Sequence, residues 1–230
     1  MVIGNGMVAK KFAQYLTQDN VVIFASGVSN SKSVIQSEFD REKELLCKTI
    51  KSIHNKKLIY FSTFNLYDPN ENNSPYCLHK LNMENLIKAE MDNFNIFRLG
   101  HVAGQTANQY TILSYLYDVI KEESAFNLWK YASRNIIDIE DISKICSYII
   151  DNNLFLNQIT NVCNDHNTSI LDIVKIFEDI TSKKGKYTIL DKGGSPDVDN
   201  TKIQPIAEHL RIVFNDIYVQ RIIYKYYNIV

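Results

Sequence analysis

Short, unbroken apolar runs alternate along the chain with longer segments in which apolar residues recur every three or four positions. Runs at 21–25, 57–61 and 94–99 have the continuous hydrophobicity of strands buried on both faces of a parallel sheet. Val2-Ile3 ends a shorter run and precedes a Gly-Asn-Gly turn. This alternation predicts a doubly wound, parallel α/β sheet with right-handed crossovers, whose ligands bind beyond the carboxyl ends of the strands.

Helical periodicity fills the segments between these strands. The first helix is predicted from an apolar stripe at Val8, Ala9, Phe12 and Leu16. The second runs from about Ser37 to Ile53, with Phe39, Leu45, Leu46 and Ile50 facing inward. A third begins at Pro75, since proline is favoured in the first turn, with Ser74 as its cap. Further helices are predicted at 112–120, 141–150 and 170–180, and short strands at 136–139 and 188–190.

The domain organisation follows from these elements. We expect residues 1–100 to form a Rossmann-like cofactor-binding part and residues 101–230 to form a smaller mixed lobe that mainly binds substrate. Residues 135–150 are expected to pack back on the Rossmann-like part, giving a single compact unit. At 230 residues and 45% apolar content, the chain is long enough for one sizeable core with an appended lobe.

Charge and cysteine usage argue against several functional classes. The 25 basic and 26 acidic residues give a formal charge of −1, so no strong field favours nucleic acid or an anionic membrane. The four cysteines form no Cys-x-x-Cys pair and the five histidines no His-Glu-x-x-His arrangement. We therefore expect free thiols, no metal site and a reducing compartment. Without a signal peptide or an apolar run near the ~20 residues of a membrane span, the predicted location is the cytoplasm.

The turn after the first strand carries the first candidate site. The segment Gly4-Asn5-Gly6-Met7-Val8-Ala9 fits the G-x-G-x-x-G/A dinucleotide fingerprint, in which small residues let the backbone approach a pyrophosphate. Its position between a strand and an amphipathic helix supports phosphate binding, although the glycines could simply make a tight turn. The end of the next strand, Ala25-Ser26-Gly27, is the second candidate cofactor contact.

Tyr-x-x-x-Lys occurs twice in a chain that has 14 tyrosines. The copy at Tyr117 lies within an amphipathic helix, so we interpret it as structural. Tyr76 and Lys80 instead begin a helix soon after a strand that ends at Thr63, and their i, i+4 spacing brings them onto one helix face. We expect the Lys80 ammonium to lower the pKa of Tyr76 by roughly 1–3 units, and Thr63 to hydrogen-bond the same substrate oxygen. The alternative is a surface tyrosine packed against a lysine stem.

With these elements in this order, the chain resembles an extended short-chain dehydrogenase/reductase of the NAD(P)-dependent nucleotide-sugar epimerase/dehydratase type, over nearly its full length. The resemblance rests on "YFSTFNLYDP", "SPYCLHK", "IFRLGHVAG", "RNIIDIEDI", "ITNVCN" and "DNTKI". It implies that Thr63, Tyr76 and Lys80 are catalytic, with Tyr76 and Lys80 also touching the cofactor.

The same resemblance implies NAD or NADP on the N-terminal sheet and a nucleoside-diphosphate sugar in the C-terminal lobe. Asn65, His101 and Arg134 fall at its substrate-binding positions, with His101 where the family usually has asparagine. It also implies a homodimer, formed through the helices at 37–53 and 75–90.

One departure from the family concerns the adenosine-binding half. The family places another strand, helix and strand before a segment like "VVIFASGVSNS", but here only four residues separate Leu16 from Val21. We interpret this as a deletion of the second and third strands, and with them of the acidic residue that grips the adenosine ribose. A rival alignment makes 21–25 the second strand, with Ser26 and Ser29 facing a ribose or its phosphate. Either way the adenosine pocket is reduced, and the choice between NAD and NADP stays open.

The residue after Thr63 bears on the reaction type. It is Phe64, where dehydratases of the family carry an acidic pair, so we favour reduction of a 4-keto sugar in the synthesis of cell-surface polysaccharide precursors. In that reading Tyr76 donates the proton, Lys80 tunes it and Thr63 orients the carbonyl. Epimerisation with the same triad stays open, and so does a non-catalytic relative that only binds, which the missing strands favour and the intact triad opposes.

Overall fold

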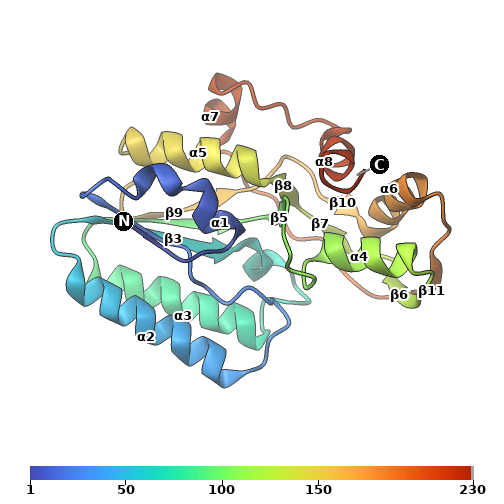
Figure 1. The fold of residues 1–230 in the computed structure, drawn as a ribbon, viewed down its shortest axis with the longest axis horizontal. Coiled ribbons are helices and arrows are strands. Elements are labelled where there is room, and N and C mark those ends of the chain that lie inside the picture. Colours follow the sequence, from blue (N-terminus) through green and yellow to red (C-terminus); the bar gives the residue numbers. More distant parts are fainter. Residues whose placement is uncertain (229–230) are drawn as a thin grey trace.

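A five-stranded parallel sheet lies at the centre of the computed structural model, which describes residues 1–228 (Figure 1). In spatial order its strands are β1 (Val2–Ile3), β2 (Val21–Phe24), β3 (Lys57–Thr63), β4 (Phe94–Leu99) and β9 (Gln158–Val162). Every residue of β2 and β3 is buried, as the unbroken apolar runs predicted. The α/β class and the parallel sheet are therefore confirmed.

The position of β2 decides between the two alignments. In the usual order 3-2-1-4-5-6 of such sheets, the second strand lies on one side of the first strand and the fourth lies on the other, next to the fifth. Here β2 pairs with β1 on one side and with β3 on the other, so it occupies the place of the fourth strand. The rival alignment is wrong. Within residues 1–228, β1 is an edge strand with nothing paired beyond it.

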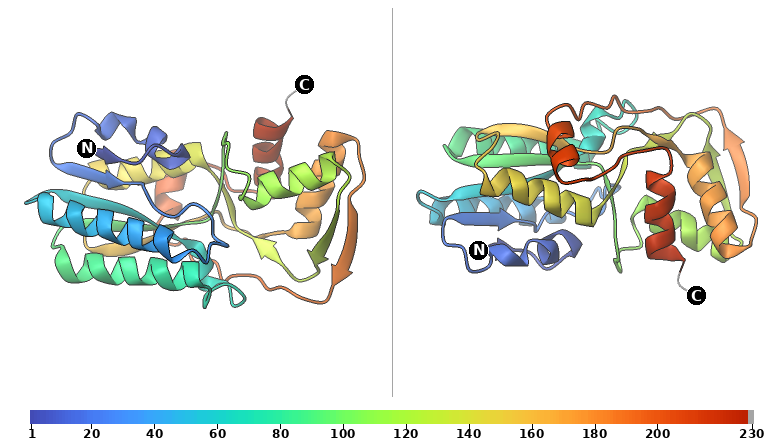
Figure 2. Two further views of the ribbon diagram at one scale, coloured as in Figure 1. Left: turned by 60° about the horizontal axis from the view of Figure 1, so that its bottom comes forward. Right: turned by 90° about the horizontal axis from the view of Figure 1, so that it is seen from above.

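Helices cover both faces of the sheet (Figures 1 and 2). On one face lie α1 (Met7–Lys11), the 3₁₀ turn η1 (Ala13–Tyr15) and α5 (Ile139–Asp151); on the other lie α2 (Gln36–Ser52) and α3 (Pro75–Glu90). Alternate strand residues separate the two cores: Ile59 and Phe97 face α5, whereas Leu58 and Ile96 face α2 and α3. This is the two-residue period of a strand that is buried on both sides.

The crossovers between the strands do not share one hand. The strands follow one another across the sheet in chain order, yet the connections through α1 and α5 run over one face and those through α2 and α3 over the other. Parallel strands that step in the same direction with helices on opposite faces have crossovers of opposite hand. The expectation of right-handed crossovers throughout is therefore wrong.

The first helix is also shorter than predicted. It ends at Lys11, and the chain continues in a 3₁₀ turn, so that Tyr15 is buried while Leu16 is 60% exposed. In a 3₁₀ turn the side chains at i and i+3 eclipse, which places Tyr15 rather than Leu16 beneath Phe12. Each predicted helix and strand after residue 20 is present within two residues at either end.

A mixed lobe with its own core follows β4. Its strands pair as β5 (His101–Ala103) with β8 (Ile136–Asp138), β6 (Ala125–Trp129) with β11 (Lys186–Leu190), and, antiparallel, β7 (Ser133–Arg134) with β10 (Thr168–Ser169). Its helices are α4 (Ile112–Lys121), α6 (Ile170–Thr181) and α8 (Tyr218–Tyr227), whereas α7 (Gln204–His209) packs against α5 in the core of the sheet. Tyr117 packs here against Phe177 and Tyr227, at 5.7 and 5.2 Å between ring centroids, as expected of a structural tyrosine.

Two features bear on the predicted location and chemistry. Across residues 1–228, every helix is too short or too polar to pass through a lipid bilayer. The four cysteines are free thiols, and three of them, Cys77, Cys146 and Cys163, are buried.

Candidate active site

A cleft of about 660 Å³ opens where the strands end and the lobe begins. It is lined by predicted site residues from six segments: Asn5, Gly6, Met7, Ala25, Ser26, Gly27, Thr63, Asn65, Tyr76, Lys80, His101 and Arg134. Gly4 lies in the same turn, against the backbone of Ala25. The fold thus brings the predicted residues to one place, while the role of each stays a prediction.

The first turn presents bare backbone to this cleft. Gly4 has φ of +124°, and a Cβ there would lie 2.3 Å from the carbonyl oxygen of Ala25, so only glycine fits. A Cβ added at Gly6, by contrast, would have nothing within 4 Å. The open surface above Gly6 and the amide groups at the start of α1 fit a dinucleotide phosphate.

The catalytic candidates meet at the start of α3. The Ser74 hydroxyl accepts a hydrogen bond from the Cys77 amide at 3.2 Å, which caps the helix and presents Tyr76 to the cleft. The side chains of Tyr76 and Thr63 both line the cleft. The ammonium of Lys80 lies 5.9 Å from the centroid of the Tyr76 ring. The three side chains are thus assembled as the sequence suggested.

A buried carboxylate beneath the cleft was missed by the sequence analysis. Glu42 of α2 is fully buried, and its Oε1 accepts a hydrogen bond from the Lys80 ammonium at 2.9 Å. Phe39, Glu42 and Leu46 follow one another on the inward face of α2. A charged residue on an apolar stripe is the signal that could have identified it, because such a residue is rarely buried without a partner.

The predicted pKa shift of Tyr76 is wrong in sign. Burial raises the pKa of Tyr76; the Lys80 ammonium and the Thr63 hydroxyl lower it, but the Glu42 carboxylate raises it, and the net shift is upward. The main reason is burial of the phenol, which the sequence did not reveal, and the Glu42 carboxylate paired with Lys80 adds to it. Tyr76 is therefore a protonated phenol at neutral pH.

His101 and Arg134 face the cleft from the lobe. Burial, with the Arg134 guanidinium nearby, lowers the pKa of His101 to about 3, so the imidazole is neutral at physiological pH. His101 lines the cleft, where the sequence placed it. Arg134 pairs with the buried carboxylate of Asp68 at 3.2 Å, which fixes its guanidinium at the cleft wall.

The charges around the cleft are mostly cationic. Among the described residues, Lys32, Arg41, Lys80 and Arg134 line it together with one carboxylate, Glu71, which is paired with Lys32. Phe64 is 1% exposed and turns into the protein, so no acid follows Thr63 into the cleft. The lining suits an anionic ligand and offers no free carboxylate to remove a proton.

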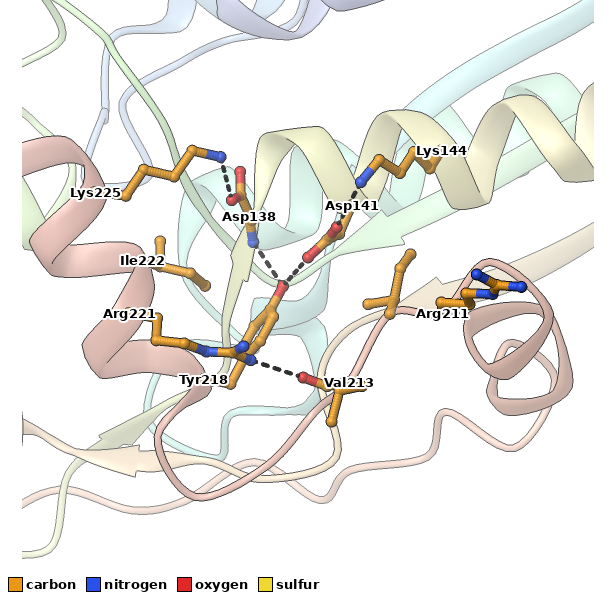
Figure 3. A pocket seen from close by; sticks show the side chains of 10 residues that line it. Asp138, Asp141, Lys144, Arg211, Val213, Tyr218, Arg221, Ile222 and Lys225 are labelled. Atoms are coloured by element: carbon orange, nitrogen blue, oxygen red, sulfur yellow. Dashed lines mark hydrogen bonds and ion pairs between the residues drawn. The ribbon is translucent and has the colours of Figure 1, made fainter.

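A second cavity, of about 260 Å³, lies between α5 and α8 (Figure 3). Both of its carboxylates have partners within the cavity: the Tyr218 hydroxyl donates to Asp141 at 2.8 Å, and the Lys225 ammonium to Asp138 at 2.8 Å. No predicted site residue lines it. These contacts join α8 to α5, so we interpret the cavity as part of the packing between the two helices.

Comparisons with known proteins agree with this geometry. Residues 4–163 match the NAD dependent epimerase/dehydratase family. A sequence search of curated proteins found no match.

Solved structures share the fold at low identity. UDP-glucuronic acid 4-epimerase from Bacillus cereus, in complex with UDP-glucuronic acid and NAD, gives a TM-score of 0.72 at 19% identity, covering 95% of this chain and 76% of that one. RMD from Pseudomonas aeruginosa, complexed with NADPH, gives 0.69 at 13% identity, with 89% and 90% covered. UDP-N-acetylglucosamine 4-epimerase from Bacillus cereus gives 0.67 at 15% identity, with 96% and 81% covered.

Proposed function

The chain belongs to the NAD dependent epimerase/dehydratase family, and from that premise we propose that it is an NAD(P)-dependent oxidoreductase that reduces the keto group of a nucleoside-diphosphate 4-keto sugar. The proposal depends on one observation: Thr63, Tyr76 and Lys80 line the same cleft as the turn at Gly6, whose backbone no side chain covers. Synthesis of cell-surface polysaccharide precursors in the cytoplasm is the proposed setting.

The first turn and the end of β2 would hold the cofactor. The amides after Gly4 and Gly6 would face its phosphates, and Ala25-Ser26-Gly27 would line its path toward Tyr76. Bound nicotinamide supplies the hydride. Because no described strand lies beyond β1, the adenosine half would have fewer contacts than in a complete sheet, and we propose no preference between NAD and NADP.

The protonation state of Tyr76 supports reduction. A phenol with a raised pKa stays protonated at neutral pH, so it can give a proton to the carbonyl oxygen as that oxygen gains negative charge. The Thr63 hydroxyl lies beside it and would orient the same oxygen. Epimerisation also requires Tyr76 to accept a proton in one half of the reaction. A tyrosine with a raised pKa starts out protonated at neutral pH, so it is less ready to accept that proton.

The substrate class rests on the cationic side chains of the cleft. Lys32, Lys80 and Arg134 are each paired with a carboxylate. Among the described residues Arg41 bonds only to Ser26, so Arg41, with the guanidinium of Arg134 already oriented by Asp68, would contact a diphosphate. Neutral His101 and Asn65 offer hydrogen bonds to sugar hydroxyls. The structurally similar UDP-glucuronic acid 4-epimerase holds UDP-glucuronic acid, a ligand of this class.

A homodimer through α2 and α3 belongs to the same proposal. The outward residues of α2 include Asp40, Lys43 and Lys51, so an interface there would be polar. Sedimentation at low and high salt tests it, because polar association weakens as salt screens the charges.

Thermal stabilisation by NAD⁺, NADH, NADP⁺ and NADPH tests the enzyme proposal, since a ligand that binds only the folded state raises the melting temperature. We expect at least one of the four to stabilise the protein. Tyr76→Phe should then abolish reduction of UDP- and dTDP-4-keto sugars while leaving that stabilisation nearly unchanged. Failure of all four to bind would favour the second candidate, a non-catalytic relative, which the absence of a described strand beyond β1 supports.

A further inference from the structure

Glu42 is held by four groups in the protein interior. Its Oε1 accepts hydrogen bonds from the Lys80 ammonium at 2.9 Å and the Tyr60 hydroxyl at 2.7 Å. Its Oε2 accepts from the Val28 amide at 2.7 Å and lies 3.1 Å from His79 Nε2. A buried carboxylate with this many partners is ionised and fixed in place.

The position of Lys80 follows from this arrangement. Its ammonium is 2.9 Å from Glu42 Oε1 but 5.9 Å from the centroid of the Tyr76 ring. Because Coulomb energy falls with distance, the carboxylate has the stronger hold on the ammonium. Gly27 closes over the pair: a Cβ there would lie 2.5 Å from Lys80 Nζ and 3.2 Å from Glu42 Oε1. The loop after β2 therefore packs directly on the ion pair.

We propose that Glu42 is a positioning residue for the reduction proposed above: it holds the Lys80 ammonium beneath the loop at Gly27 and Val28 and offsets its charge, so that Tyr76 enters the reaction as a protonated donor. Glu42 touches no ligand and acts through Lys80. This role of Glu42 rests on the proposed function, because it concerns the proton donor of that reaction. The contacts that support it and the experiment that tests it do not require enzyme activity.

The surrounding titratable groups support this assignment. Around Lys80 and Tyr76 stand Glu42 of α2, Tyr60 of β3, and His79, Cys77 and Glu84 of α3. Burial alone would raise the pKa of Glu42, but the Lys80 ammonium and hydrogen bonds from His79, Tyr60 and Val28 bring it well below its usual range. Burial alone would lower the pKa of Lys80, but Glu42 raises it. At neutral pH the site therefore holds a carboxylate, an ammonium and a neutral phenol.

Glu42→Gln removes the negative charge and leaves the ammonium of Lys80 unpaired. Ionisation of Tyr76 would then supply the missing counter-charge, so its titration midpoint should fall by about one pH unit or more. The measurement is tyrosinate ultraviolet absorbance against pH, with the same variant carrying Tyr76→Phe subtracted to isolate Tyr76. Glu42→Asp keeps the charge, and Tyr60→Phe removes a neutral hydrogen bond to the same carboxylate; both should stay near the wild-type midpoint.

An unchanged or higher midpoint in folded Glu42→Gln would overturn the proposal, because the carboxylate would then be structural or Lys80 would have lost its proton instead. Should Glu42→Gln fail to fold, the wild-type protein still decides: in ¹³C-tyrosine NMR the resonance of Tyr76, assigned by Tyr76→Phe, must titrate above the ordinary value of about 10. Titration below it would refute the role of Glu42. Neither readout uses substrate, so a missing reductase activity would count against the proposed function alone.

Discussion

Alanine at Gly6 tests whether the first turn approaches a dinucleotide phosphate, because the folded chain has room for the methyl group. A Cβ there has nothing within 4 Å, and φ of −74° suits any residue. Losing glycine at the helix N-cap lowers stability, while a less flexible unfolded chain restores about 0.4–1 kcal/mol. We therefore expect the free energy of unfolding to change by less than about 1 kcal/mol, or about 4 °C in Tm.

Gly4→Ala is the matched contrast in the same turn. Its φ of +124° and a contact of 2.3 Å to the Ala25 carbonyl oxygen make the methyl group incompatible with the fold. Backbone strain costs about 1–3 kcal/mol and overpacking about the same. The sum of roughly 2–6 kcal/mol lowers Tm by roughly 4–24 °C.

Differential scanning fluorimetry with and without the stabilising cofactor separates folding from binding. At a hundredfold excess over its Kd, a ligand adds about 2.7 kcal/mol of stability. In Gly6→Ala we expect at least a tenfold loss of affinity, equal to about 1.4 kcal/mol, on a nearly unchanged apo Tm. Wild-type affinity in Gly6→Ala would show that the backbone of this turn does not approach the cofactor, and a fully stable Gly4→Ala would refute the turn geometry itself.

Three further predictions concern buried charges. Arg98→Met should lower the free energy of unfolding, measured in urea, by about 3–5 kcal/mol, because the fully buried Glu84 loses hydrogen bonds of 2.9 and 2.6 Å and keeps its charge. Adding Glu84→Gln should recover part of the loss. An unchanged urea midpoint in Arg98→Met would contradict the pairing. The pKa of Glu42 is lowered in the folded state, so its contribution to stability is present above the unfolded pKa of about 4.3 and is lost as the pH falls below that value. In Glu42→Gln the free energy of unfolding should therefore decrease less steeply as the pH is lowered. An equally steep decrease in the variant would contradict this. With its pKa at about 3, His101 should show no imidazole titration by NMR at any pH from about 5 to 8, whereas a midpoint near the ordinary value of about 6.5 would contradict its burial.

Local signals account for most of what the sequence predicted. Unbroken apolar runs define the strands, and the Ser74-Pro75 pair starts α3 through contacts within one helical turn. The carboxyl ends of parallel strands converge, so residues after β1, β2 and β3 had to meet in one cleft. These inferences need no knowledge of distant contacts.

The wrong predictions concern features that depend on contacts between residues far apart in the chain or on local backbone geometry. The upward shift of the Tyr76 pKa comes first from burial and then from Glu42, which lies 38 positions before Lys80 and reaches it only through the packing of α2 on α3. The burial of Tyr15 in place of Leu16 depends on a 3₁₀ turn within the short connection to β2. Periodicity alone assumes an α-helix and cannot anticipate either.

The hand of the crossover through α1 bears on the interpretation that two strands are deleted from the sheet. In a complete sheet of this type the chain leaves the first strand away from the fourth, and a right-handed crossover sets the face on which the first helix lies. Here the chain steps instead toward the place of the fourth strand, yet α1 and α5 share a face. Contacts with α5 hold the segment there: Ser143 donates to the Lys11 carbonyl at 3.1 Å, and the Tyr15 hydroxyl to Asp151 at 2.8 Å. A βαβ unit built without those constraints would be right-handed in nearly every case. A deletion of two strands from a complete sheet with its first helix already docked predicts this opposite hand, and it would leave the ends of β1, β2 and β3, where we propose the chemistry, next to one another.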